Sequence, residues 1–205
     1  MGDPVDIGLG EPAATGDHIC ALYSGPIERD AILLPFIRSA LRSGDKCICV
    51  IDSTEPAELL AGIGLDTEID LPACLASRQF DLVRAADTTM RSGRFRSTDM
   101  VGFWKASIAG AMNAGRYQRV RAASEICQSL RNMPDWGEVV RHESEINRML
   151  SLYAQVLLCL YDLEKVGGAF LVDMVSMHPR LFINGRLTEN PHYLPPDEWL
   201  ARQSA

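Results

Sequence analysis

The sequence lacks a long apolar run, and this argues against a membrane-spanning protein. Its longest dense apolar stretches are Ala31–Ile37 and Val156–Tyr161, and neither approaches the ~20 residues needed to cross a bilayer. The N-terminal segment has no basic region followed by an apolar one, so no secretory signal is visible. We therefore expect a cytoplasmic location, in which the six cysteines are reduced thiols rather than a disulfide framework.

The sequence also lacks an excess of positive charge. Lys and Arg number 20 against 27 Asp and Glu, which gives a net charge of −7. Nucleic-acid binding and docking on anionic membranes both depend on basic patches, so we expect no direct nucleic-acid partner and no membrane partner. A chain of 205 residues with 47% apolar residues is long enough for one domain with a substantial core.

A nucleotide-binding loop is missing as well. The turn after the first apolar segment, Ser24–Asp30, is where a phosphate-binding loop would lie, but it contains no Lys and carries two acids. Such a loop needs glycines to bring backbone amides to the phosphates, followed by Lys and Ser or Thr. A dinucleotide fingerprint and a Gly-x-Ser-x-Gly elbow are also absent. We therefore expect no enzyme activity and assign no catalytic residue.

What is present is an alternation of apolar segments with helical patterns. Short apolar runs predict strands at 18–23, 46–52, 80–85, 117–123 and 155–161. Helical periodicity predicts helices over 33–41 (with a kink or a late start at Pro35), 56–61, 99–114, 136–153 and 168–177. This alternation is typical of an α/β fold with a mostly parallel sheet covered on both faces.

The ends of the chain differ from its middle in composition. Residues 1–16 are rich in Gly, Pro and Asp, so we expect a flexible leader there. Near the other end, Asn184-Gly185 is the preferred pair for a type I′ turn and predicts a C-terminal β-hairpin. The predicted organisation is a leader over 1–16, a single domain over 17–196 and a tail over 197–205.

The predicted ligand site lies where the strands end. Ligands of parallel sheets usually bind outside the carboxyl ends of the strands. Glu125 and Asp162 both end apolar strands, so we expect them to share one crevice, to which Tyr23 and Tyr161 add ring faces and hydroxyls. His178, further along the chain, is a further candidate ligand-binding residue. The alternative left open is that the carboxylates only cap neighbouring helices, and that His178 only complements a helix dipole.

The cysteines give no metal motif along the sequence. We take Cys47 and Cys49 to point to opposite faces of one strand and to be buried structural thiols. The other cysteines are scattered, and with His18 or His178 they could form a site only through the tertiary fold. We therefore predict no metal site and identify no cofactor.

A series of short motifs in a fixed order resembles a known family. The motifs are His18-Ile19-Cys20, Pro35-Phe36, Lys46–Asp52, Gly93-Arg94-Phe95, Glu125, Glu143, Cys159-Leu160-Tyr161-Asp162, His178-Pro179 and Asn190-Pro191-x-Tyr193. They resemble the MEDS domain, the methanogen/methylotroph DcmR sensory domain, over residues 16–196. One departure is that Ile126-Cys127-Gln128 follows Glu125, where family members commonly have an aromatic residue.

The resemblance implies a fold and a class of function. It implies a three-layer RecA-like fold, related to KaiC-type ATPases, that has lost the phosphate-binding loop. Family members are sensory inputs, often joined to histidine-kinase or helix-turn-helix output domains, and are linked in some organisms to one-carbon or halomethane metabolism. No output domain follows Ala205, so we expect an excised domain or a stand-alone sensor acting in trans.

We therefore expect a non-catalytic sensory or regulatory module. It would bind a small ligand or a signalling protein and control a kinase or a transcription regulator, and a homodimer is compatible with this role. Two alternatives stay open: a degenerate nucleotide-binding enzyme of the RecA/KaiC type, and a pure protein-interaction subunit.

Overall fold

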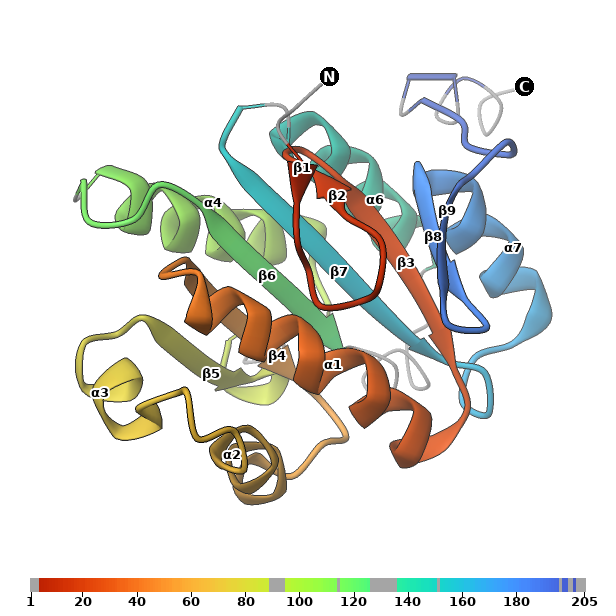
Figure 1. Ribbon diagram of the computed structural model, residues 1–205. Coiled ribbons are helices and arrows are strands. Elements are labelled where there is room, and N and C mark those ends of the chain that lie inside the picture. Colours follow the sequence, from red (N-terminus) through yellow and green to blue (C-terminus); the bar gives the residue numbers. More distant parts are fainter. Residues whose placement is uncertain are drawn as a thin grey trace.

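A seven-stranded sheet forms the centre of the protein (Figure 1). The computed structural model describes residues 4–88, 95–113, 115–125, 136–150, 152–195, 197–198 and 201. Across the sheet the strands are β5 (Phe80–Arg84), β4 (Lys46–Ile51), β6 (Val120–Glu125), β7 (Gln155–Asp162), β3 (His18–Tyr23), β8 (Arg180–Ile183) and β9 (Arg186–Glu189). Neighbouring strands run parallel except for the β8–β9 hairpin.

Helices cover both faces of this sheet. One face carries α1 (Gly25–Arg42), α2 (Pro56–Gly64) and α3 (Leu71–Ala76), and a buried apolar cluster joins them to the strands. The opposite face carries α4 (Ser97–Asn113), α6 (Trp136–Leu150) and α7 (Gly168–Met177), with a second buried cluster (Figure 1). The predicted three-layer α/β fold, with its mostly parallel sheet and C-terminal hairpin, is confirmed.

The element boundaries follow the sequence signals closely in most places. Strand β3 and helix α7 have the predicted ends, and the hairpin turn holds Asn184 at φ 50° and Gly185 at φ 74°, as a type I′ turn requires. Helix α1 begins earlier than predicted, at Gly25, and runs through Pro35. Helix α3 and a short 3₁₀ turn, Ala85–Asp87, were not predicted.

The predicted flexible leader is a packed part of the domain. Its described part contains strands β1 (Pro4–Val5) and β2 (Ala13–Ala14), which pair antiparallel. Four of its apolar side chains are buried in the cluster that includes α1: Val5, Ile7, Leu9 and Ala13. Burial of these side chains ties the segment down despite its Gly- and Pro-rich composition. Most of the predicted tail, 197–205, lies outside the described residues.

The segment lies so close to α1 that one position needs glycine. Gly8 has φ 73°, and a Cβ atom there would lie 2.5 Å from the backbone oxygen of Pro35. The hydroxyl of Ser39, one turn further along α1, donates a hydrogen bond to the backbone oxygen of Asp6 at 2.8 Å. A side chain at position 8 would push the segment away from the helix.

The cysteine prediction was right about burial and wrong about direction. Cys47 and Cys49 are two positions apart, so their side chains lie on the same face of β4, and both belong to the cluster that includes α1. All five cysteines in the described part of the chain are buried thiols outside any disulfide. Cys127 lies outside that part, as do the sequence motif residues Gly93 and Arg94 and the departure at Ile126 and Gln128.

Within the described ranges, no helix combines the length and the apolar character that crossing a membrane would require.

Candidate functional site

The strand register brings three of the five predicted site residues to one edge and one face of the sheet. Glu125 lies opposite Leu160 across the β6–β7 pair, and Tyr23 lies opposite Asp162 across the β3–β7 pair. Because side chains alternate along a strand, Glu125, Tyr23 and Asp162 all lie on the face covered by α1. The Tyr23 hydroxyl donates to Glu125 Oε1 at 3.3 Å, which links the outer strands of this trio directly.

The other two predicted residues lie on the opposite face, so Tyr161 does not share the expected crevice with Glu125 and Asp162, and His178 lies apart from it as well. Tyr161 precedes Asp162 by one position and therefore points toward α6 and α7. His178 follows the last residue of α7 and is fully buried on that same face. Tyr23, Glu125 and Asp162 therefore lie at the carboxyl edge of the sheet, whereas Tyr161 and His178 lie in the layer beneath α6 and α7. A ligand-binding role for any of the five residues stays a prediction.

Glu125 is held by the loop that follows β4. Its Oε2 atom accepts three backbone N–H groups, from Asp52 at 3.1 Å, Ser53 at 3.2 Å and Thr54 at 3.0 Å. Its Oε1 atom accepts the Ser53 hydroxyl at 2.5 Å. Burial raises the pKa of Glu125, but these hydrogen bonds outweigh it and lower the pKa below its ordinary value. The fully buried carboxylate thus fixes the path from β4 to α2.

Lys165 connects the two carboxylate groups of this edge. Its ammonium group donates to the Ser53 hydroxyl at 2.9 Å and lies 3.1 Å from Asp162 Oδ2. The Lys165 side chain is 26% exposed, whereas Asp162 is 2% exposed. Lys165 was not among the predicted site residues, and its place three residues after Asp162 was the available signal in the sequence. We call Tyr23, Ser53, Glu125, Asp162 and Lys165 the carboxyl-edge group.

The start of α1 is occupied by a side chain of the protein itself. The backbone N–H of Ser24, the N-cap residue, donates to Glu28 Oε2 at 2.7 Å. In a phosphate-binding loop, N–H groups at this position face the phosphates. Here a carboxylate from the first helical turn takes that place.

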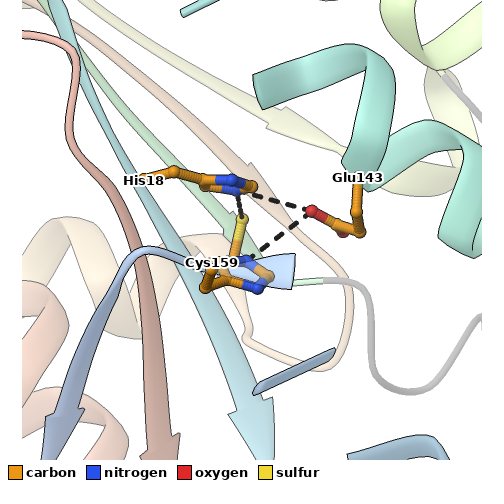
Figure 2. Close-up of side chains that lie close together, drawn as sticks. His18, Glu143 and Cys159 are labelled. Carbon is orange, nitrogen blue, oxygen red and sulfur yellow. Dashed lines mark hydrogen bonds and ion pairs between the residues drawn. The ribbon is translucent and has the colours of Figure 1, made fainter. Parts of the chain in front are cut away.

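A second constellation lies on the opposite face, beneath α6 and α7 (Figure 2). It consists of His18 from β3, Cys159 from β7, Glu143 from α6 and His178 from the end of α7, which we call the buried cluster. One ligand atom from each residue lies within 4.8 Å of all the others. The four residues are 0–6% exposed.

Individual contacts in the buried cluster are short. His18 Nε2 lies 3.2 Å from Cys159 Sγ and 3.4 Å from Glu143 Oε2. His178 Nε2 lies 3.6 Å from the same Glu143 oxygen, and neither of those two atoms has a hydrogen-bond partner. The other Glu143 oxygen accepts the Tyr161 hydroxyl at 3.1 Å.

The outer atoms of both imidazole rings face oxygen acceptors. His178 Nδ1 lies 2.6 Å from the backbone oxygen of Met174. His18 Nδ1 lies 3.1 Å from Asn147 Oδ1, and the amide of Asn147 is oriented by its own donation to the Met177 backbone oxygen at 2.6 Å. Each Nδ1 therefore carries the proton in a neutral ring, and each Nε2 turns a lone pair toward Glu143.

Burial governs the protonation of the buried cluster in the protein alone. It raises the pKa of Glu143 to about 7, against a smaller opposing effect of the Tyr161 hydrogen bond. It lowers the pKa of His178 to about 4, and burial together with the nearby His178 lowers the pKa of His18 well below its usual range. Desolvation thus favours the neutral form of all three groups.

Comparison with known proteins decides the family. A family model described as the methanogen/methylotroph DcmR sensory domain, MEDS, matches residues 17–179. The chain belongs to the MEDS family. This MEDS domain is 27% identical over 176 residues to the transcriptional repressor DcmR of Methylorubrum extorquens, a match that covers 82% of the chain and 60% of the repressor. The chain thus spans about 60% of the length of that relative.

Solved structures with a similar fold come from archaea. The flagellar accessory protein FlaH of Methanocaldococcus jannaschii matches with a TM-score of 0.61 and 11% identity, over 90% of this chain and 83% of that one. The KaiC-like protein PH0186 of Pyrococcus horikoshii matches with a TM-score of 0.59 and 10% identity, over 88% of this chain and 80% of that one. At such identities the likeness establishes a RecA/KaiC-like fold for the MEDS domain, and nothing beyond the fold.

Sequence reasoning named only part of the buried cluster as a site. His18, His178 and Cys159 were considered as members of a site that only the tertiary fold could build, and Glu143 was named without a role in such a site. The pairing of β3 with β7 and the rotation of α6 bring these residues together. Both depend on packing between segments that are far apart in the sequence.

A surface cavity of about 560 Å³ lies at the opposite edge of the sheet from the carboxyl-edge group. It is bounded by α3, α4 and the start of β5, and its lining includes Lys46, Arg78, Asp81 and Arg116. The Lys46 ammonium group lies 2.6 Å from Asp81 Oδ2, and Arg78 lies 3.2 Å from the same carboxylate. Lys46 and Arg78 thus share one carboxylate, and Arg116 donates to the backbone oxygen of Ser77 at 3.1 Å.

Proposed function

We propose that this MEDS domain is a non-catalytic sensory module, which binds a small ligand or a signalling protein and controls transcription or a signalling kinase. The observation that carries the proposal is the match over residues 17–179 to a family of sensory domains. The relative of known role is a transcriptional repressor, and 60% of its length is shared with this chain. The repressor's remaining length is outside the match, so a link to transcription is part of the proposal.

The carboxyl-edge group is the proposed place of ligand contact. Parallel sheets bind ligands at this edge, and Lys165 is its partly exposed charged group, held between Ser53 and Asp162. A small polar ligand with an acceptor oxygen could take the ammonium group from Asp162. Ser53 would then lose its hydrogen bond from Lys165. Because the Ser53 hydroxyl also donates to Glu125, the change would reach Glu125 and the loop that leads into α2.

Native mass spectrometry of tag-free protein from its own host tests the ligand proposal. The chain has a mass of 22.6 kDa, and we expect an additional mass that is lost under denaturing conditions. Lys165→Met should lose the added mass, while Lys105→Met, which changes an exposed lysine on α4, should retain it. Detection of the bare chain alone, or equal retention by both variants, would contradict ligand binding at this edge.

The regulatory part of the proposal has its own test in the host. Deletion of the gene should change the transcription of a defined set of genes, and wild-type protein should restore it. Lys165→Met should restore it less well than Lys105→Met at equal protein levels. A deletion strain whose transcripts match those of its parent would contradict a role in transcription and leave a signalling kinase as the output to examine.

A further inference from the structure

The donor atoms of the buried cluster have the spacing of a tetrahedral metal site. Zinc binds imidazole nitrogen at about 2.0–2.1 Å, carboxylate oxygen at about 2.0–2.2 Å and thiolate sulfur at about 2.3 Å, which places neighbouring ligand atoms about 3.3–3.8 Å apart in a tetrahedron. The contacts at 3.2, 3.4 and 3.6 Å come close to that range. All remaining pairs lie within 4.8 Å, so the set is already gathered around one point.

The hydrogen bonds around the buried cluster orient it for a cation. His18 and His178 each direct an Nε2 lone pair inward, because their Nδ1 atoms face the oxygens of Asn147 and Met174. Metal-binding histidines characteristically make this outer contact, which fixes the tautomer and the ring orientation. Two inward lone pairs facing the carboxyl group of Glu143 need a proton or a cation between them, and one metal ion would satisfy all three groups together.

Two buried polar atoms of the cluster lack a hydrogen bond. Glu143 Oε2 and His178 Nε2 are without a hydrogen bond and lie 3.6 Å apart. Buried polar atoms are costly when left unsatisfied. Both atoms lie within 4.8 Å of the ligand atoms of His18 and Cys159, where one ion would satisfy them together.

We propose that the buried cluster binds one divalent transition-metal ion, and that zinc is the ion which fits it. Two imidazoles, one thiolate and one carboxylate suit zinc, whereas magnesium and calcium prefer an all-oxygen shell. Binding would release the thiol proton of Cys159 and any proton on Glu143 to solvent. The two anionic ligands then balance the charge of the ion, which makes the site neutral in an interior that excludes water.

The four ligands come from four separate elements, so the ion would act as a cross-link. It would join β3 and β7 of the sheet to α6 and to the end of α7. With four protein ligands and 0–6% exposure, the site leaves no open position of the kind that catalytic zinc uses. The expected role is to hold α6 and α7 on the sheet.

Metal analysis of tag-free protein tests the site directly. Protein purified without chelator should contain one zinc ion per chain by inductively coupled plasma mass spectrometry. After removal of zinc, Co²⁺ should bind with one-to-one stoichiometry and produce a thiolate-to-cobalt charge-transfer absorption. Adding Zn²⁺ to the metal-free protein should raise its melting temperature, because the ion binds the folded state.

A matched pair of cysteine variants assigns the signal. Cys159→Ser should lose the charge-transfer absorption, and Cys20→Ser should retain it; Cys20 is fully buried and lies opposite Cys159 in the β3–β7 pair, on the same face. If Cys159→Ser does not fold, the cobalt spectrum and the zinc-dependent thermal shift of the wild-type protein decide whether the buried cluster binds metal.

A wild-type chain without retained metal, cobalt absorption or a zinc-dependent thermal shift would overturn the proposal, and so would equal spectra from the two cysteine variants. In that case a proton shared between Glu143 and the two histidines, and not a metal ion, holds the buried cluster together. These measurements use the metal ions alone, so their outcome does not test the ligand proposal for the carboxyl-edge group.

Discussion

Ser53 gives Glu125 two hydrogen bonds, one from its backbone N–H at 3.2 Å and one from its hydroxyl at 2.5 Å. Together they reach both oxygens of the carboxylate. Asp52 and Thr54 add their backbone N–H groups, so one buried side chain from β6 satisfies three consecutive donors of the loop after β4. Glu125 thus stabilises this loop whether or not a ligand is bound.

Glu125→Gln should therefore destabilise the protein. The amide can keep one oxygen toward the loop, but it loses the charge that strengthens these hydrogen bonds. We expect the free energy of unfolding to fall by about 1.5–3 kcal/mol, the range for hydrogen bonds to a charged group. Urea unfolding followed by circular dichroism measures the change. An unchanged midpoint would mean that the loop does not depend on the carboxylate.

The same stabilisation should depend on pH. The pKa of Glu125 in the folded protein is lowered from its ordinary value of 4.5, so its contribution is complete above pH 4.5 and is lost as the pH falls through the folded pKa. The stability gap between wild type and Glu125→Gln should be widest near neutral pH and should narrow below pH 4.5. A gap that grows on acidification would contradict a lowered pKa.

MgATP should bind weakly, if at all. The turn Ser24–Asp30 contains no lysine, and Glu28 accepts the first N–H of the α1 terminus, so a phosphate would meet a carboxylate there. Isothermal titration calorimetry should give no dissociation constant at or below the micromolar range, roughly −8 kcal/mol. Tight binding or hydrolysis would revive the degenerate-enzyme alternative.

The six cysteines should all be reduced thiols, and Cys47 and Cys49 should react slowly in the folded state. Burial raises the pKa of Cys47 to about 12 and that of Cys49 well above its usual range, so little thiolate forms at pH 8. Alkylation in denaturant with a chelator, without reductant, should add one label to each of the six cysteines. A disulfide in freshly isolated protein would contradict the expected reducing location.

The sheet was predictable because its signals are local. Strands β4 and β7 are continuous apolar runs buried on both faces, and Asn184-Gly185 specifies its turn by backbone conformation alone. The position of Glu125 and Asp162 at one edge followed from strand direction. The leader was missed because Gly and Pro obscured the alternation of Val5, Ile7 and Leu9, which are buried against α1.

The division of the site was predictable in part, and the buried cluster was not. Alternation along β7 already separates Tyr161 from Asp162, and combining them in one crevice overlooked that rule. His18 and Cys159, in contrast, are 141 positions apart. Their contact depends on β3 pairing with β7, and Glu143 joins them only through the packing of α6, which no local pattern encodes.

Asn147 should control the zinc affinity of the buried cluster without touching the ion. Its side chain accepts from His18 and donates to the Met177 backbone oxygen beside His178, so it positions both rings. We expect Asn147→Ala to weaken zinc binding by about 10–100-fold, the usual effect of losing such an outer contact. Asn147→Asp, which keeps the acceptor, should bind zinc more tightly than Asn147→Ala.

Competition with a chromophoric zinc chelator measures these affinities. Arg141→Ala serves as the control, because Arg141 lies on the same helix with a side chain that is 63% exposed. If the role of Asn147 were purely structural, Asn147→Ala would lower the melting temperature of the metal-free protein but leave the zinc affinity at the value of the control variant. A positioning role requires the zinc affinity itself to fall in Asn147→Ala and to recover in Asn147→Asp, because aspartate keeps an acceptor for His18 Nδ1 and alanine does not.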